Sequence, residues 1–161
     1  MTEEQSLANV RDQISRFGWS ITAVEGAVDD EGVFPAFAYS IGFTRHRLPE
    51  ILISGRPTEE AYQVLNQLGN GIKRGLRLVP EVRLTIAGLN LFFLPIASPA
   101  NVLLTAGAVY QNRQIEALQA IWADSEGHFP WEQAIPDDLT QPLFCQLPNR
   151  WHYCQEHQPP E

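Results

Sequence analysis

The stretch GHFPWE, residues 127–132, places an imidazole, two aromatic rings and a carboxylate close together in the chain. Pro130 fixes its own backbone φ angle and restricts the residue before it, so the rings of Phe129 and Trp131 should be held in set directions. An apolar wall with a few fixed polar groups is what a ligand pocket requires. The same stretch is also typical of a packed turn, in which both rings belong to the core.

Glu50, Asp124 and Glu132 each follow apolar residues or proline in places where the carboxyl group could be partly desolvated. A carboxyl group in such a place can act as an acid or a base, because burial or a charged neighbour moves a pKa toward the working pH. The alternative is structural: Asp124 ends its strand, Glu50 accepts backbone hydrogen bonds and Glu132 opens a turn. We therefore assign no catalytic residue from the sequence.

The stretch FPAFAYSIGF, residues 34–43, alternates large and small side chains. The period of two of a strand places Phe37, Tyr39, Ile41 and Phe43 on one face, and Ala36, Ala38, Ser40 and Gly42 on the other. Such a small-residue face lets a helix, another backbone or a flat ligand approach closely, and close helix packing is the commoner case.

We expect the polar and aromatic residues of these segments to border one ligand-binding cleft. The residues expected there are Tyr39, Ser40, His46, Glu50, Trp122, Asp124, His128, Trp131 and Glu132.

Several common reaction signatures are absent from the sequence. Ser40 lies in AYSIG, which has the Ser-x-Gly half of a nucleophile elbow but lacks its leading glycine. There is no glycine-rich phosphate loop, no His-Glu-x-x-His and no Cys-x-x-Cys. Cys145, His152, Cys154 and His157 carry soft ligand atoms, but their spacing matches no recognised zinc motif, so we predict no metal site and name no cofactor.

Charge and hydropathy exclude further classes of protein. The chain has 161 residues, 44% of them hydrophobic, and its 11 Lys and Arg against 19 Asp and Glu give a net charge of −8. Scattered basic residues predict no nucleic-acid partner, and an acidic surface disfavours anionic membranes and favours a basic protein partner. The sequence shows no secretory signal pattern and no long uninterrupted apolar run, which predicts a cytoplasmic protein.

The hydrophobic pattern predicts an α+β domain with a mostly antiparallel sheet covered by about three helices. We expect a single domain over residues 1–144 and a partly disordered C-terminal tail over 145–161. Thr58 is expected to cap the second helix, and Ser98 with Pro99 to open the third. The order from Glu50 to Ile86 could add one parallel strand crossover. Helices are expected over 3–17, 56–75 and 100–111, and strands over 19–26, 34–43, 50–55, 78–86, 90–97 and 116–124.

Dispersed motifs of the chain resemble a known family. The strings RFGWSI, FAYSIGFT, LPEILISG, LN and GNGI, followed by ALQAIWADSEGHFPWE and QPLF, are similar to the bacterial domain of unknown function 4262 family over about residues 8–144. The resemblance implies no activity, because none is established for that family, and the tail from Cys145 lies outside it. Its pattern falls on Gly18–Trp19, Tyr39–Gly42, Pro49–Glu50, Asn66, Gln119–Asp124, Gly127–Glu132 and Gln141–Pro142.

Three hypotheses of function follow from the sequence. The first is a module that binds a protein or a small molecule, with a basic protein as one candidate partner. The second is a small hydrolase or transferase that uses Asp124, His128 or Glu132. The third is a binder of a flat cofactor on the small-residue face around Ser40.

Overall fold

A computed structural model describes residues 2–29, 32–34, 36–111, 114–132 and 141–144, with the side chains of 27–29 and 32–34 left out. The predicted tail and its Cys145, His152, Cys154 and His157 lie outside these residues.

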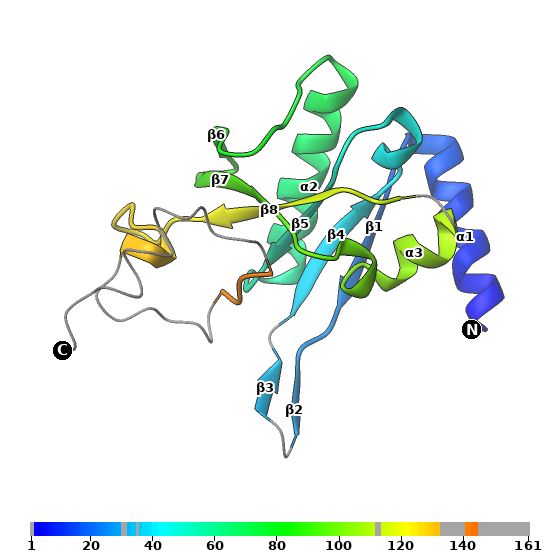
Figure 1. The fold of residues 1–161 in the computed structure, drawn as a ribbon, viewed down its shortest axis with the longest axis horizontal. Coiled ribbons are helices and arrows are strands. Elements are labelled where there is room, and N and C mark those ends of the chain that lie inside the picture. Colours follow the sequence, from blue (N-terminus) through cyan, green and yellow to red (C-terminus); the bar gives the residue numbers. More distant parts are fainter. Residues whose placement is uncertain (1, 30–31, 35, 112–113, 133–140, 145–161) are drawn as a thin grey trace.

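A six-stranded sheet forms the centre of the structure, in the order β1-β4-β5-β8-β7-β6 (Figure 1). All neighbouring strands pair antiparallel except β5 and β8, which are parallel. A separate two-stranded ribbon extends the hairpin between β1 and β4. The strands are β1 Ser20–Val24, β4 Phe37–Ile41, β5 Glu50–Ser54, β6 Arg83–Ile86, β7 Leu89–Pro95 and β8 Ala117–Trp122, with β2 Ala27–Asp29 and β3 Gly32–Phe34 in the ribbon.

Helices cover both faces of the sheet in the described part of the chain. Helix α2 (Thr58–Lys73) packs on one face, whereas α1 (Glu3–Phe17) and the short α3 (Leu104–Tyr110) pack on the other (Figure 1). The described segments also contain three single 3-10 turns: η1 Phe43–His46, η2 Pro99–Asn101 and η3 Pro130–Glu132. The predicted α+β class, mostly antiparallel sheet and three helices are confirmed.

None of the described helices is both long enough and apolar enough to span a lipid bilayer.

Two predicted helix starts differ from the structure. Pro57 is the N-cap of α2, and Thr58 is its first helical residue and makes no capping bond. The predicted third helix divides into η2 and α3, because Leu103 has a non-helical ψ of 70° between them. Ser98 does open η2, but its side chain makes no capping bond there.

The predicted parallel crossover is present, because β6 follows α2 and runs parallel to β5 in the same sheet, but β8 and β7 lie between the two strands. Strand β6, which follows α2, lies at the sheet edge, and the parallel neighbour of β5 is β8. The burial patterns explain this order: every residue of β8 is buried, whereas β6 alternates exposed and half-buried residues. A strand buried on both faces belongs in the middle of a sheet.

The two faces of β4 divide as the period of two requires up to Ile41. Tyr39 and Ile41 join the core beneath α1 and α3, whereas Ala38 faces α2. The small-residue face is therefore used for close helix packing. Phe43 was expected beside Tyr39 but packs in the α2 core, because the strand ends at Ile41 and Gly42, with φ of 145°, turns the chain.

Gly42 should be the least replaceable glycine of this region. A Cβ atom there would lie 2.5 Å from the carbonyl oxygen of Gly18 and 2.8 Å from the Cα atom of Trp19, both backbone atoms. We expect Gly42→Ala to lower the free energy of unfolding by about 3 kcal/mol in urea denaturation. Gly18→Ala is the matched control, because Gly18 also has a positive φ but open space at its Cβ position, and should cost about 1 kcal/mol. Equal losses in the two variants would contradict the close approach.

Candidate functional site

Glu50 lies at the start of β5 and is fully buried, with 0% of its surface exposed. Its carboxylate accepts backbone N–H bonds from Gly42 at 3.1 Å, Phe43 at 3.3 Å and Thr44 at 3.0 Å. These three groups belong to the start of η1, whose N–H groups have no partner within the turn. Glu50 thus caps the η1 turn from the neighbouring strand.

Three hydroxyl groups complete the shell of Glu50. Ser40 donates to Oε1 at 2.9 Å, while Thr44 and Tyr110 donate to Oε2 at 2.7 and 2.8 Å. A buried carboxylate is tolerated only when donors replace its lost water, and six donors do so here. The Ser40 hydroxyl also accepts the N–H of Ile51 at 2.9 Å, which joins β4 to β5.

Tyr110 brings α3 into this cluster. Burial raises the pKa of its hydroxyl well above the ordinary value of about 10, and the adjacent Glu50 carboxylate raises it further. The hydroxyl therefore stays protonated and acts as a donor. We name Ser40, Thr44, Glu50 and Tyr110 the Glu50 cluster.

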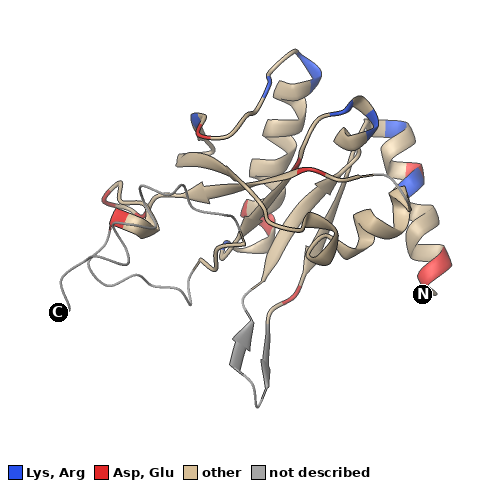
Figure 2. Cartoon of the chain, viewed as in Figure 1, with Lys and Arg blue, Asp and Glu red and all other residues tan. Residues whose placement is uncertain are grey.

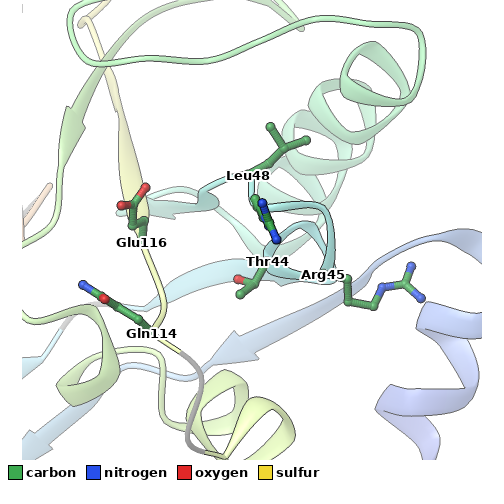
Figure 3. A pocket seen from close by; sticks show the side chains of 6 residues that line it. Thr44, Arg45, Leu48, Gln114 and Glu116 are labelled. Carbon is green, nitrogen blue, oxygen red and sulfur yellow. The ribbon is translucent and has the colours of Figure 1, made fainter.

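A cavity of about 560 Å³ opens beside the Glu50 cluster (Figure 3). We call it the η1 cavity. Its size is in the range of small-molecule sites. Thr44 and Leu48 come from the η1 side, and Gln114 and Glu116 from the chain that leads into β8. The lining residues are Thr44, Arg45, Arg47, Leu48, Gln114 and Glu116.

Basic side chains gather around this end of the protein, although the chain as a whole is acidic. Figure 2 shows most of the blue segments at the ends of α1 and α2 and in the η1 loop. A second cavity of about 400 Å³ shares Arg45 with the η1 cavity and is also lined by Arg11 and Tyr110. Within the described ranges, Arg11, Arg45 and Arg47 form no ion pair with a carboxylate.

The GHFPWE stretch forms a packed turn at the far end of β8. Asp124 Oδ1 accepts the N–H groups of Glu126 and His128, each at 2.9 Å, and Glu132 Oε1 accepts that of Phe129 at 3.0 Å. The Phe129 and Trp131 rings stack with centroids 5.2 Å apart. The structural alternative is thus found for Asp124 and Glu132, as it is for Glu50.

A family model described as a domain of unknown function (DUF4262) matches residues 13–136, which is most of the chain. The chain belongs to this family. No curated protein and no solved structure gave a match. The DUF4262 match includes Glu50, Tyr110 and the packed turn, but it stops before the described segment 141–144.

The nine candidate residues of this DUF4262 domain do not meet in the single cleft that we expected. In the parallel pair, Glu50 lies opposite Ala117, and Trp122 is five residues further along β8, about 16 Å away. Ser40 and Glu50 touch at one end of the sheet, whereas Asp124, His128, Trp131 and Glu132 follow Trp122 at the other (Figure 1).

The remaining two candidates, Tyr39 and His46, are close in sequence to residues of the Glu50 cluster but are not part of that cluster. Tyr39 points to the opposite face from Ala38, and its hydroxyl oxygen accepts the N–H of Thr105 at the start of α3. His46 is exposed on η1 and does not line the η1 cavity. Within the described segments, no group of three His, Cys, Asp or Glu side chains could hold a metal ion.

Sequence reasoning missed several residues of this region. Tyr110, Arg47 and Glu116 lie outside the quoted motifs, and Thr44 ends the FAYSIGFT string without a signal for its role. Only the tertiary structure brings the four residues to Glu50 and its cavity. Gln119 did have a signal, because it is a lone amide inside the apolar strand ALQAIW. It is fully buried and bonds the carbonyl of Pro142 and the N–H of Phe144, which ties segment 141–144 to the sheet.

Removing the charge of Glu50 should destabilise the fold strongly. Glu50→Gln keeps the shape but presents an amide N–H₂ group to buried donors, so we expect a loss of at least about 3 kcal/mol in urea unfolding. Glu116→Gln is the same chemical change at an exposed position of the same region, and it should change the free energy of unfolding by no more than about 0.5 kcal/mol. A loss below about 1 kcal/mol for Glu50→Gln would contradict the role of the carboxylate.

The Tyr110 hydroxyl should make stability depend on alkaline pH. Its pKa is raised in the folded state, so its contribution is present below about pH 10 and is lost as the pH rises, because the unfolded chain releases this proton first. The difference in unfolding free energy between wild type and Tyr110→Phe should shrink by about 1 kcal/mol between pH 9 and pH 11. Tyr62→Phe, at a partly exposed tyrosine, is the control. A difference for Tyr110→Phe that stays constant would disprove the raised pKa.

Proposed function

We propose that this DUF4262 domain is a binding module, and that its ligand site is the η1 cavity. The observation that carries the proposal is the Glu50 cluster, which holds one wall of that cavity rigid from beneath. A ligand that meets a preorganised wall loses less free energy on binding than one that must order a loop.

The η1 wall is held at both of its ends. At the start of the wall, the backbone N–H groups of Gly42 and Thr44 donate to Glu50. At its end, the N–H of Arg47 donates to the carbonyl oxygen of Thr44, and the N–H of Leu48 donates to the carbonyl oxygen of Phe43. The side chains of Thr44, Arg47 and Leu48 thus project from a backbone whose hydrogen bonds are already made.

Arg47, the C-cap residue of η1, has a strained backbone that supports the proposal. Its φ of 60° and ψ of 35° place it in the left-handed region, which costs a residue with a Cβ about 1–2 kcal/mol. Glycine would occupy this position without that cost. Strained residues concentrate at binding sites, where the side chain itself is required.

The local charge favours a ligand with an anionic group. Arg45 and Arg47 line the η1 cavity, and Glu116 is its one acidic residue among those described. The net charge of −8 by itself favoured a basic protein partner, but the side chains at the cavity favour an anion. A cytoplasmic location remains a prediction from the sequence.

The other two hypotheses have less support. A hydrolase would need free carboxylates, but Asp124 and Glu132 accept N–H groups of their own turn, and Ser40 and Glu50 are completely buried. A flat cofactor would need an open small-residue face, and α2 packs on that face at Ala38.

Replacing Arg47 should separate stability from binding. We expect Arg47→Gly to raise the free energy of unfolding by about 1 kcal/mol, because it removes the left-handed strain, while Arg47→Ala should not. A thermal-shift screen of small carboxylates, phosphates and sulfonates should find compounds that stabilise the wild type but neither variant.

Arg74→Ala, at the exposed C-cap residue of α2 outside the η1 cavity, is the matched control and should keep the response to those compounds. The proposal is wrong if the compounds stabilise both Arg47 variants as much as the wild type, or if no compound with an anionic group, whether or not it also carries an ammonium, stabilises the wild type.

A further inference from the structure

The η1 cavity carries opposite charges on its two sides. Arg47 belongs to the η1 side, and Glu116 precedes β8 on the other. In the part of the chain that the structure describes, neither side chain forms an ion pair or a side-chain hydrogen bond. Each is therefore available to a ligand group of the opposite sign.

Arg45, the second cation of the cavity, is directed elsewhere. Its guanidinium donates to the carbonyl oxygens of Gly42 at 3.3 Å and Gly18 at 3.2 Å. Figure 3 shows this side chain extending away from Gln114 and Glu116, toward the neighbouring helix. Arg47 thus remains as the cationic group with no partner in the described chain.

The Glu50 cluster determines what Thr44 can offer to a ligand. The hydroxyl hydrogen of Thr44 is donated to Glu50 at 2.7 Å, so toward the cavity its oxygen can only accept a hydrogen bond. The Thr44 backbone N–H is also committed to Glu50. Thr44 and Glu116 together therefore favour a hydrogen-bond donor with positive charge, and the buried Glu50 charge beneath Thr44 acts in the same direction.

From this arrangement we infer that the ligand of the η1 cavity is a small zwitterion, with a carboxylate bound by Arg47 and an ammonium bound by Glu116 and Thr44. The inference rests on the proposed function of this cavity and names its ligand class. A plain anion would pair with Arg47, but its negative charge would lie beside the Glu116 carboxylate. This repulsion between like charges disfavours the binding of plain anions. The half-buried Leu48 side chain in the lining suits the methylene groups between the two charges.

The inference can be tested by isothermal titration calorimetry with zwitterions of increasing charge separation: glycine, β-alanine, γ-aminobutyrate and triglycine. Each is compared with its N-acetyl derivative, which lacks the ammonium, and its methyl ester, which lacks the carboxylate. At least one zwitterion should bind, and both of its blocked forms should bind about tenfold more weakly or worse, because each loses a charge-assisted hydrogen bond.

Two variants assign the charges to residues. Arg47→Ala should weaken the binding of the zwitterion and of the N-acetyl compound alike. Glu116→Gln should abolish the preference for the zwitterion over the N-acetyl compound. Glu116 is exposed, so its replacement should leave the fold intact, which circular dichroism checks.

The outcomes distinguish failure of the inference from failure of the proposed function. If an N-acetyl compound binds as tightly as its zwitterion, the inference is wrong and the cavity binds simple anions. If Glu116→Gln keeps the preference for the zwitterion, the inference is wrong in placing the ammonium at Glu116. If no zwitterion binds but the anions of the thermal-shift screen bind through Arg47, the inference alone fails. If neither set binds, both fail.

Discussion

The buried carboxylate of Glu50 is the constraint on which this end of the fold depends. A charge without water must receive hydrogen bonds from the protein, and here the donors come from β4, η1 and α3. Because the donors belong to three different elements, satisfying one carboxylate fixes all three relative to β5. The hydrogen bonds to Glu50 thereby fix the conformation of the η1 loop, which makes one wall of the η1 cavity, as the sheet ladder fixes the strands beside it.

Buried polar groups serve a similar purpose at the other end of β8. The parallel pairing of β5 and β8 has its last registered pair at Leu52 and Gln119, and beyond it the side-chain amide of Gln141 bonds both the N–H and the carbonyl of Trp122. A side chain thus replaces a missing strand in the ladder. Such networks are stable only when every member is satisfied, which makes them strong determinants of a single arrangement.

The two ends differ in what they leave available. At the GHFPWE turn, the carboxylates of Asp124 and Glu132 accept backbone groups of the turn itself, and the rings are buried. At the η1 end, by contrast, Arg47 and Glu116 line a cavity without partners in the described chain, and Arg47 holds a strained backbone angle. Rigid support beneath unpaired charges is what distinguishes a binding site from a packed turn.

The sequence by itself determined the α+β class and most of the elements, because hydrophobic period and turn chemistry are local properties. For Glu50, Asp124 and Glu132 it offered a structural role only as an alternative to a place in a ligand-binding cleft. It could not show that GHFPWE and Glu50 lie at opposite ends of the sheet, since that follows from the parallel pairing of β5 with β8 across a long connection. It also could not reveal Tyr110 as a partner of Glu50, sixty residues away. Only the tertiary structure decided these placements, because they depend on strand order and on the hydrogen bonds that a buried charge demands.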